Sequence, residues 1–495
     1  MKALRAGFLV EFSCKAAWLI LIILLPFTSL PLLQRLSGAD MVSPASAIPL
    51  LWLVIAWFLP YVLKGGRLPR QIMPLLAFLL VAFIASAAAY FTNIPPLKGK
   101  SVLSREVQAL LTLMIGMAFY LVVSAWPRTE NRLRLSFQAL NFAGLLVITW
   151  SLVQGFFWFS RHSFPSFMVQ VQSLFSLNTF FDYRVTGFAF EPSWLAHMLN
   201  MAFLPFWLSA TVQRSSVHRF RLWKFSFENL LLVGGAAVLF LSYSRVGWLA
   251  FVLTMAYLLV KGTLWLAQRL QTAIMSRIET SPPWRWLLRS GLWVGILASF
   301  LVAYTGSVLG LAYVGSKVDY RLQHLFQAPD PTQVTDIFGY ANYLGFAERV
   351  VYWATGWEIF NDHPFLGVGI GNAGYYFPQY MPAFGYALTE VDTLFNYNTY
   401  LPNTKSMWSR LLAETGIVGF AFFVSWLFVL WQSGRGLQKS SNSLLRTAGL
   451  AGILSIVAFL IEGFSIDSFA LPYLWFSMGL LTAAGGLLRM NGKPA

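Results

Sequence analysis

Long apolar runs separated by short polar segments make up most of the chain. A helix needs about 20 mostly apolar residues to cross the hydrocarbon core of a bilayer, and runs of this length recur from one end of the sequence to the other. Only helices and closed barrels satisfy their backbone hydrogen bonds inside lipid. The pattern therefore predicts an all-α polytopic integral membrane protein with about twelve transmembrane helices. The predicted spans are 12–33, 45–63, 71–91, 107–126, 136–159, 193–212, 227–243, 246–267, 287–312, 409–432, 444–463 and 468–488.

Basic residues indicate the side of the membrane on which each loop lies. Lys and Arg gather at the N-terminus, at the C-terminus and in alternate loops such as 64–70 and 214–224, whereas most acidic residues fall in the other loops. Because cytoplasmic loops are enriched in Lys and Arg, both termini are predicted to be cytoplasmic. The stretch 264–279 is predicted to be an interfacial helix with Arg269 and Arg277 on its polar side.

Two segments on the opposite side are longer than a simple turn, at 160–192 and at 313–408. Long loops are usually functional, and the second is rich in Asp, Asn, Tyr, Pro and Gly. It divides the chain into spans 1–9 in residues 1–312, a partly helical external domain in 313–408, and spans 10–12 in 409–495. Function is therefore expected on the external face.

Composition excludes two other classes of protein. Hydrophobic residues make up 57% of the chain and charged residues 11%. Soluble domains usually have about 25% charged residues, so a soluble fold of this composition could not cover its surface with charged side chains. The aromatic content of 17% argues against disorder. The net charge of +16 reflects loops that set orientation rather than one basic patch, so nucleic acid is not an expected partner. The single cysteine, Cys14, excludes an intramolecular disulfide and a cysteine metal site.

Three groups of ionisable residues lie near span ends, where they must face protein or water. The first, 184–193, contains Arg184 and the pair Glu191-Pro192 at the entry to the sixth span. Pro192 suits the first turn of a helix, which would place Glu191 at the positive helix end. Glu191 would then be able to take a proton from a sugar hydroxyl. The alternative is a helix-capping carboxylate paired with Arg184.

The second group, 242–248, reads Ser-Tyr-Ser-Arg-Val-Gly-Trp and forms a very short turn between two apolar runs. Arg245 in this turn lies close to hydrocarbon, where a lone cation is costly. A lipid-linked phosphate would neutralise the charge of Arg245, since a guanidinium binds phosphate bidentately. The alternative is that Arg245 extends to the lipid headgroups.

The third group lies in the long external segment. Arg349, Tyr352, Trp353 and Gly356 recur at three- and four-residue spacings, which predicts one face of a helix that ends before Pro364. A cation beside aromatic rings would suit a diphosphate or a sugar ring. The alternative is an Arg–Glu pair on a solvated helix.

A glycine-rich run comes after this helix. Gly369, Gly371 and Gly374 match the dinucleotide-binding pattern G-x-G-x-x-G, but no strand–turn–helix pattern surrounds them, and Pro378 and Pro382 interrupt the residues after them. The run is therefore predicted to be a tight turn that seats the external segment on the membrane. The five histidines show no metal-ligand spacing, so we expect them to be packed or solvated.

Taken in order, these segments resemble the bacterial O-antigen ligase and O-antigen or exopolysaccharide polymerase superfamily. The resemblance rests on 242–248, on Arg349 followed by Asn-Asp-His-Pro-Phe-Leu-Gly-Val-Gly at 361–369, on 411–419 and on 471–479. It covers most of the chain, because the spans and the long external segment before the tenth span also agree. It implies a GT-C-like membrane glycosyltransferase of the bacterial inner membrane with its active site on the periplasmic face.

The resemblance also implies the donor, which is a glycan linked to a polyprenyl (undecaprenyl) diphosphate, used without cofactor, nucleotide sugar or metal. Arg245 and Arg349 correspond by position to two family arginines that bind the donor diphosphate, where cations would stabilise the leaving group. Membrane lipid would surround the donor tail, and a chain-length regulator protein is a further expected partner. The other candidates for substrate binding are Arg184, Lys405, Tyr352, Trp353 and Arg410.

One position departs from the family pattern. Ligases carry a catalytic His-Asn about eleven residues before the glycine that aligns with Gly416, whereas this chain has Lys405-Ser406. A lysine there would be a cation that binds phosphate rather than a base. Since the segment 184–193 resembles the polymerase branch, the sequence favours a polymerase with Glu191 as base. The alternatives are a ligase that transfers the chain to lipid A core or another acceptor, and a flippase or transporter of lipid-linked sugars.

Overall fold

The computed structural model describes residues 2–37, 42–275, 282–317, 323–324, 326–327 and 337–491. They are mainly helical, and the strands among them are β1 (Arg221–Leu222) and β2 (Phe225–Ser226), which pair antiparallel. The predicted all-α class is therefore confirmed. The residues form two compact units, unit 1 (Met1–Trp248 and Val351–Ala495) and unit 2 (Leu249–Val350). The predicted boundaries after 312 and 408 concern membrane topology rather than compactness, and they stay a prediction.

The N-terminal part of unit 1 is a series of helices that includes two π-helical turns, η1 and η3. Its elements are α1 (Lys2–Ile23), α2 (Pro31–Ser37), α3 (Ala47–Leu53), η1 (Val54–Phe58), α4 (Leu59–Leu63), η2 (Arg70–Ile72), α5 (Met73–Ala89), α6 (Val102–Ala125), α7 (Glu130–Arg161), α8 (Ser166–Phe175), α9 (Pro192–Met198), η3 (Leu199–Phe203), α10 (Leu204–Val212) and α11 (Phe227–Leu241).

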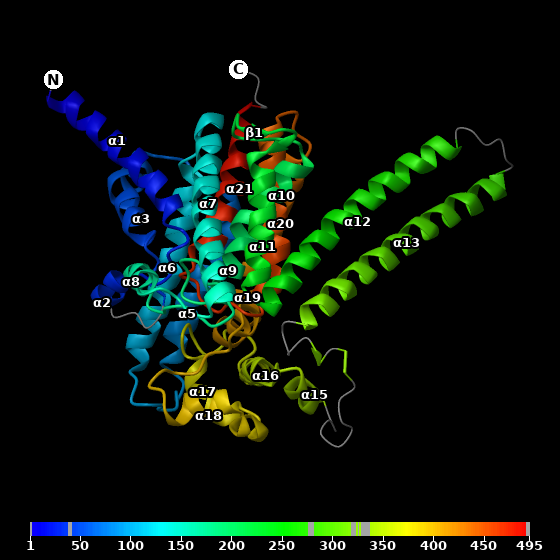
Figure 1. Cartoon of the computed structure of the whole chain (residues 1–495). Coiled ribbons are helices and arrows are strands. Elements are labelled where there is room, and N and C mark those ends of the chain that lie inside the picture. The colour runs from blue at the N-terminus through cyan, green and yellow to red at the C-terminus, as the bar shows by residue number, and fades with distance from the viewer. Residues whose placement is uncertain are drawn as a thin grey trace. The chain divides into compact units, whose positions relative to one another are not determined.

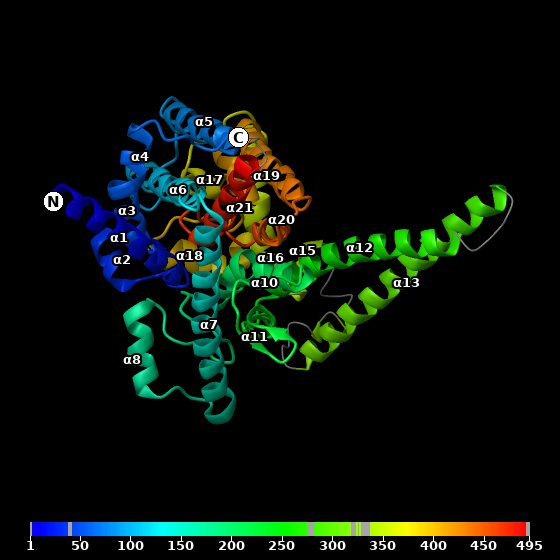
Figure 2. The same ribbon diagram turned by 90° about the horizontal axis from the view of Figure 1, so that it is seen from above.

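The C-terminal part of unit 1 supplies the helices that complete its core. They are α17 (Ala373–Tyr380), η4 (Ala383–Ala387), α18 (Thr389–Asn396), α19 (Met407–Leu437), α20 (Ser443–Glu462) and α21 (Pro472–Asn491). The last three pack on one another and on α5, α6 and α10, segments far apart in the sequence (Figures 1 and 2). Large buried side chains such as Trp207, Trp426 and Trp475 fill the space between them.

Unit 2 consists mainly of a long helical hairpin. Helix α12 (Arg245–Met275) begins at the end of unit 1 and is followed by α13 (Pro282–Ser316) and α15 (Ile337–Tyr343); α16 (Ala347–Asp362) leads back into unit 1. Trp293 Nε1 donates to Gln271 Oε1 at 3.2 Å, and the Tyr304 hydroxyl donates to the Val252 carbonyl, which joins α12 to α13. In the most apolar window of α13, no residue is buried, as is expected of a helix in lipid.

Eight helices of the described residues are long and apolar enough to cross a membrane, and each overlaps a predicted span. Two shorter apolar helices, Ala47–Leu63 and Phe227–Leu241, coincide with two further predicted spans. The chain is a membrane protein; the count of twelve spans stays a prediction. Two details of the predicted helices were wrong. Helix α1 ends at Ile23 rather than at 33, because Pro26 follows and proline cannot continue the ladder.

The second detail is the proposed interfacial helix 264–279. Residues 264–275 continue α12 without a break, and Arg269 lies over the Trp265 ring at 4.4 Å. An uninterrupted apolar pattern with good helix formers extends the helix past the membrane boundary expected for it. Arg277 lies outside the described residues.

Helices α17 and α18, yellow in Figure 1, lie together at one end of unit 1. Together with α16 they enclose a small core of their own, made of Val351, Tyr352, Ile359, Val368, Ala373, Tyr375, Tyr376, Phe377, Met381, Val391, Leu401 and Ala413. The described part of 313–408 is therefore partly helical, as predicted, and its residues from Val351 on share this small core.

Candidate functional site

The glycine-rich run between α16 and α17 is a turn seated on α19. Gly367, Gly369 and Gly371 have φ angles of 66°, 89° and 85°, in the left-handed region that favours glycine. The amide of Val368 donates to the Ala413 carbonyl at 2.9 Å, and that of Gly369 to the Glu414 carbonyl at 3.0 Å. The predicted tight turn is therefore confirmed.

Helix α19 is interrupted where this turn meets it. Gly416 has φ 61° and ψ −169°, far from helical values. The amide of Ile417 donates to the Pro364 carbonyl at 2.8 Å rather than to the Ala413 carbonyl one helical turn back. The break therefore leaves the Ala413 and Glu414 carbonyls to accept from the glycine-rich turn, which fixes the register of that turn on α19.

The same turn is tied to α6. Asn372 Nδ2 donates to Glu106 Oε1 at 2.6 Å and to the Val368 carbonyl at 3.0 Å. A Cβ atom at Gly371 would lie 2.8 Å from the Cβ atom of Ala109 on α6, so only glycine allows this approach. The glycine-rich turn thus joins α6 to α19 and brings the polar ends of both helices to one place.

A cavity of about 850 Å³ opens beside this junction. Its apolar wall comes mainly from α3, η1 and α6 and includes Leu50, Leu51, Val54, Leu111, Met114, Ile115 and Ala118. Its polar wall comes from α6, α19 and the segments before α19 and α21, and includes Arg105, Gln108, Thr112, Asn403, Thr404, Arg410, Glu414, Ser465, Asp467 and Ser468. An elongated amphipathic molecule fits such a division.

Arg410 organises the polar wall. Its Nε donates to Glu414 Oε2 at 2.8 Å, its Nη1 donates to the main-chain carbonyl of Asp467, and its Cζ lies 4.9 Å from the centroid of the Phe469 ring. The guanidinium thus connects α19 to the segment between α20 and α21. In the described part of the chain, no hydrogen bond or ion pair engages the Asp467 carboxylate, which lies in the cavity wall.

The structure brings two of the three predicted groups together. Arg184 Nε donates to the Ser242 carbonyl at 3.0 Å, and the Val185 amide donates to the Leu241 carbonyl at 3.1 Å. Tyr243 turns the chain with φ 49°, and Arg245, two residues later, begins α12 and is half-buried. Arg184 therefore supports the turn that carries Arg245.

Glu191 lies at the start of α9, as predicted. It is the residue before Pro192, has an extended backbone, and accepts a hydrogen bond from the Ser193 hydroxyl on Oε1. On the same helical segment, Asn200 Nδ2 donates to the Gly247 carbonyl at 2.8 Å. The segment that begins at Glu191 thus packs against the start of α12.

The third group forms the predicted helix α16, which ends at Asp362. Arg349 belongs to unit 2, and its Nη1 is buried without a hydrogen-bond partner among the described residues. Tyr352 is completely buried in the small core, and its role in substrate binding stays a prediction. Trp353 packs edge-on against Phe464 with ring centroids 5.4 Å apart.

Lys405 lies just before α19 and beside the cavity wall. Its ammonium group forms an ion pair with Glu390 and lies 5.0 Å from the centroid of the Tyr352 ring. Its φ of 48° places the backbone in the left-handed region. The position at which the sequence resemblance places the histidine of ligases therefore holds a cation that contacts a carboxylate.

Of the predicted site residues, Arg410 is the one that lines the cavity among the described residues. Sequence reasoning missed Arg105, Glu414 and Asp467 as cavity residues. A signal existed for two of them, because Arg105 precedes the span 107–126 and Asp467 follows the span 444–463, and ionisable residues near span ends are functional candidates. The roles assigned to Glu191, Arg245 and Arg349 stay predictions.

Part of the chain matches a known protein family. Residues 230–424 match the family model described as O-Antigen ligase. The matched segment begins in α11 and ends within α19, so it contains Arg245, Arg349, Lys405, Arg410 and Glu414. Comparison with curated proteins gives no match. The resemblance to the O-antigen ligase and polymerase superfamily is thereby confirmed.

Proposed function

We propose that this protein is a metal-independent polysaccharide polymerase of the bacterial inner membrane. It transfers a glycan chain from a polyprenyl-diphosphate-linked donor to the non-reducing-end hydroxyl of a second lipid-linked repeat unit. The active site lies on the periplasmic face, and no cofactor takes part. The match of residues 230–424 to the O-antigen ligase family model supports glycosyl transfer, and the arrangement of the cavity supports the kind of donor.

The cavity has an apolar wall and a polar wall, and this separation is the observation that best supports the proposal. Leu51, Leu111 and Met114 in its apolar wall are each more than two-fifths exposed, as a wall that receives a polyprenyl tail from the bilayer would be. Arg105 and Arg410 lie in the polar wall, where guanidinium groups bind phosphate oxygens well. A donor with an apolar tail, a diphosphate and a sugar chain matches this order of surfaces.

Three arginines are therefore candidates for holding the diphosphate. The family resemblance gives this role to Arg245 and Arg349, and the cavity adds Arg105, whereas the Arg410 guanidinium is already engaged by Glu414 and the Asp467 carbonyl. A preorganised cation that meets the charge developing on the leaving diphosphate would lower the barrier to glycosyl transfer. The lipid-linked donor and the surrounding membrane lipid are the proposed partners, with a chain-length regulator protein as a further one.

Polymerisation is favoured over ligation by the residue at position 405. A ligase of this family uses a histidine base at that place, whereas Lys405 here contacts Glu390. An ammonium group offers three N–H donors and has no lone pair with which to accept a proton. If the chain is nevertheless a ligase, glycan will move in one step onto lipid A core or another acceptor without lengthening.

Reconstitution tests the proposal. The purified full-length protein in phospholipid vesicles should convert a matched lipid-linked repeat into a ladder of longer chains. Arg245→Ala and Arg349→Ala should each lower the rate about 100-fold or more, the usual cost of removing one such stabilising group. Arg435→Ala is the matched control, because this arginine is exposed in the last turn of α19.

Two results would contradict the proposal. Movement of labelled lipid across the vesicle membrane with no change in glycan length would indicate a flippase or transporter. Arg245→Ala and Arg349→Ala variants that fold normally and produce the ladder at the wild-type rate would remove the proposed diphosphate site, even if the wild-type protein polymerises.

A further inference from the structure

Among the described residues, the carboxylates of Glu414 and Asp467 line the cavity, and their surroundings differ. Glu414 accepts from Arg410 Nε at 2.8 Å, and its side chain is 6% exposed. The Glu414 carboxylate is thus already engaged by the guanidinium and largely closed off from solvent. Asp467 is more exposed than Glu414, and among the described residues its carboxylate has no hydrogen bond or ion pair. It is therefore the carboxylate that is available to a ligand.

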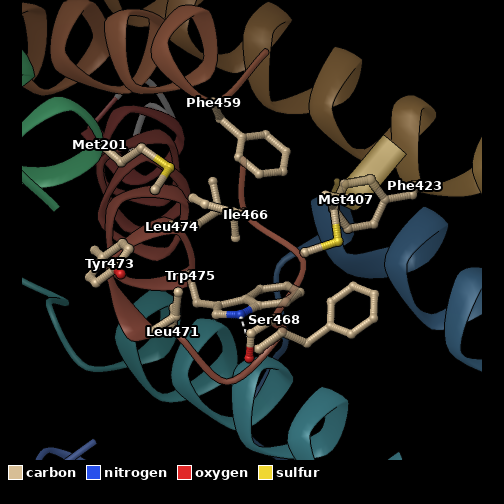
Figure 3. Close-up of a pocket in the computed structure, with 11 residues that line it drawn as sticks. Met201, Met407, Phe423, Phe459, Ile466, Ser468, Leu471, Tyr473, Leu474 and Trp475 are labelled. Carbon is tan, nitrogen blue, oxygen red and sulfur yellow. Dashed lines mark hydrogen bonds between the residues drawn. The ribbon is translucent and has the colours of Figure 1, made fainter. Parts of the chain in front are cut away.

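The segment that carries Asp467 is held in place from both sides. The Ile466 amide donates to the Glu462 carbonyl at 3.0 Å, and Arg410 Nη1 donates to the Asp467 carbonyl. Ile466 and Phe469 also line a small apolar pocket, where Trp475 Nε1 donates to the Phe469 carbonyl at 2.7 Å (Figure 3). Asp467, between them, lines the large cavity.

We infer that the Asp467 carboxylate is the base that accepts the proton of the acceptor sugar hydroxyl, and that Arg410 is the positioning residue that holds the Asp467 backbone at the cavity wall. The inference rests on the proposed glycosyl transfer and adds the residue that activates the acceptor. It assigns to Asp467 the role predicted for Glu191, whose carboxylate accepts from Ser193 and does not line the large cavity.

The proposed step is a displacement at the anomeric carbon of the donor sugar. The acceptor O–H proton passes to an Asp467 carboxylate oxygen while the hydroxyl oxygen forms a bond to that carbon. The bond between the carbon and the diphosphate oxygen breaks, and its electron pair leaves with the polyprenyl diphosphate. Asp467 later returns the proton to solvent, which restores the base. Arg410 touches neither reacting sugar in this step and acts through Asp467.

Kinetics of the reconstituted full-length protein test the inference. Asp467→Asn should lower kcat about 100-fold or more, the usual contribution of a general base, with little change in KM for the lipid-linked repeat. Asp467→Glu should recover part of the rate because it keeps a carboxylate. The acidic limb of the kcat/KM profile, present in the wild type, should be absent in Asp467→Asn. Arg410→Lys should lower kcat and displace that limb.

Asp392→Asn is the matched control. This aspartate lies on α18 and accepts from Asn396 Nδ2 at 2.6 Å, and the variant should retain the wild-type rate. An Asp467→Asn protein that keeps kcat within about fivefold of wild type, or keeps the acidic limb, overturns the inference while polymerisation stands. A loss confined to Glu191→Gln or Glu414→Gln also overturns it. Failure of the wild-type protein to transfer any glycan instead overturns the proposed function.

Discussion

His197 Nδ1 lies 2.6 Å from Glu462 Oε2 in the interior of unit 1, where the pair joins α9 to the last residue of α20. The second carboxylate oxygen, Glu462 Oε1, accepts from Asn200 Nδ2 at 2.6 Å. The side chains of His197 and Glu462 are at most 1% exposed. A polar group at this depth is stable only with its partners in place, so the pair fixes the position of the segment that begins at Glu191.

Replacing Glu462 by Ala should therefore destabilise the protein by about 3–5 kcal/mol, since removal of one partner leaves the other buried and unpaired. Thermal unfolding in detergent measures the loss. Glu462→Gln should cost less, because its amide oxygen still accepts a hydrogen bond. Glu358→Ala, at an exposed position of α16, is the control. Equal unfolding temperatures for Glu462→Ala and Glu358→Ala would show that the buried pair adds nothing.

Gly416→Ala should strain the backbone and displace the glycine-rich turn. At φ 61° and ψ −169° an L side chain costs about 1–3 kcal/mol, and a Cβ atom there would lie 2.2 Å from the Phe365 carbonyl oxygen. Both unfolding temperature and polymerisation rate should fall. Gly436→Ala in the same helix, with no atom near its added Cβ, should gain about 0.5–1 kcal/mol. A Gly416→Ala protein as stable as Gly436→Ala would contradict the strain at Gly416.

The helices could be predicted from the sequence because their cause is local. Each long apolar run carries its own signal, and runs such as 444–463 and 107–126 correspond closely to α20 and α6. The end of α1 was placed too late because apolar residues continue past Pro26. Hydrophobicity alone extends the span there, whereas the backbone constraint of proline ends the helix. The helix α16 and the turn at Gly367–Gly371 were predicted from spacing and glycine content alone.

The cavity could not be predicted in the same way, because residues far apart in the sequence form it. Arg105, Arg410 and Asp467 meet only after α6, α19 and the segment before α21 have packed. Tyr352, which was predicted to bind substrate, is buried in the small core. A helical face of aromatic residues has the same spacing in a sugar-binding site and in a core, so the sequence alone could not indicate this burial. Arg184 was expected to pair with Glu191 or to bind substrate. Instead its Nε donates to the Ser242 carbonyl, and a hydrogen bond to a backbone carbonyl far along the chain cannot be predicted from sequence.

Lys405 offers a test of whether its charge serves stability or donor binding. Its ion pair with Glu390 joins side chains that are 36% and 49% exposed, so Lys405→Met should lower the free energy of unfolding by no more than about 1 kcal/mol. If the ammonium group contacts donor phosphate, KM for the lipid-linked repeat should rise while kcat changes little. Glu390→Gln is the matched variant, which removes the pair and keeps the cation. Identical kinetic effects of both changes would assign Lys405 to the ion pair alone.

Tyr380 on α17 provides a test of pH dependence outside the spans. Burial, together with its 2.6 Å hydrogen bond to Asp362 Oδ2, raises the pKa of Tyr380 to about 12. Its ordinary value is about 10, so the neutral hydroxyl stabilises the fold fully below pH 10. This stabilisation is lost as pH rises from 10 to about 12, because the unfolded chain releases the proton first. Unfolding temperatures from pH 9 to 12 should therefore fall more steeply for wild type than for Tyr380→Phe. Tyr397→Phe, at a ring that is 79% exposed, should retain the wild-type slope, and a Tyr380→Phe slope as steep as that control would contradict the stabilising role of the hydroxyl.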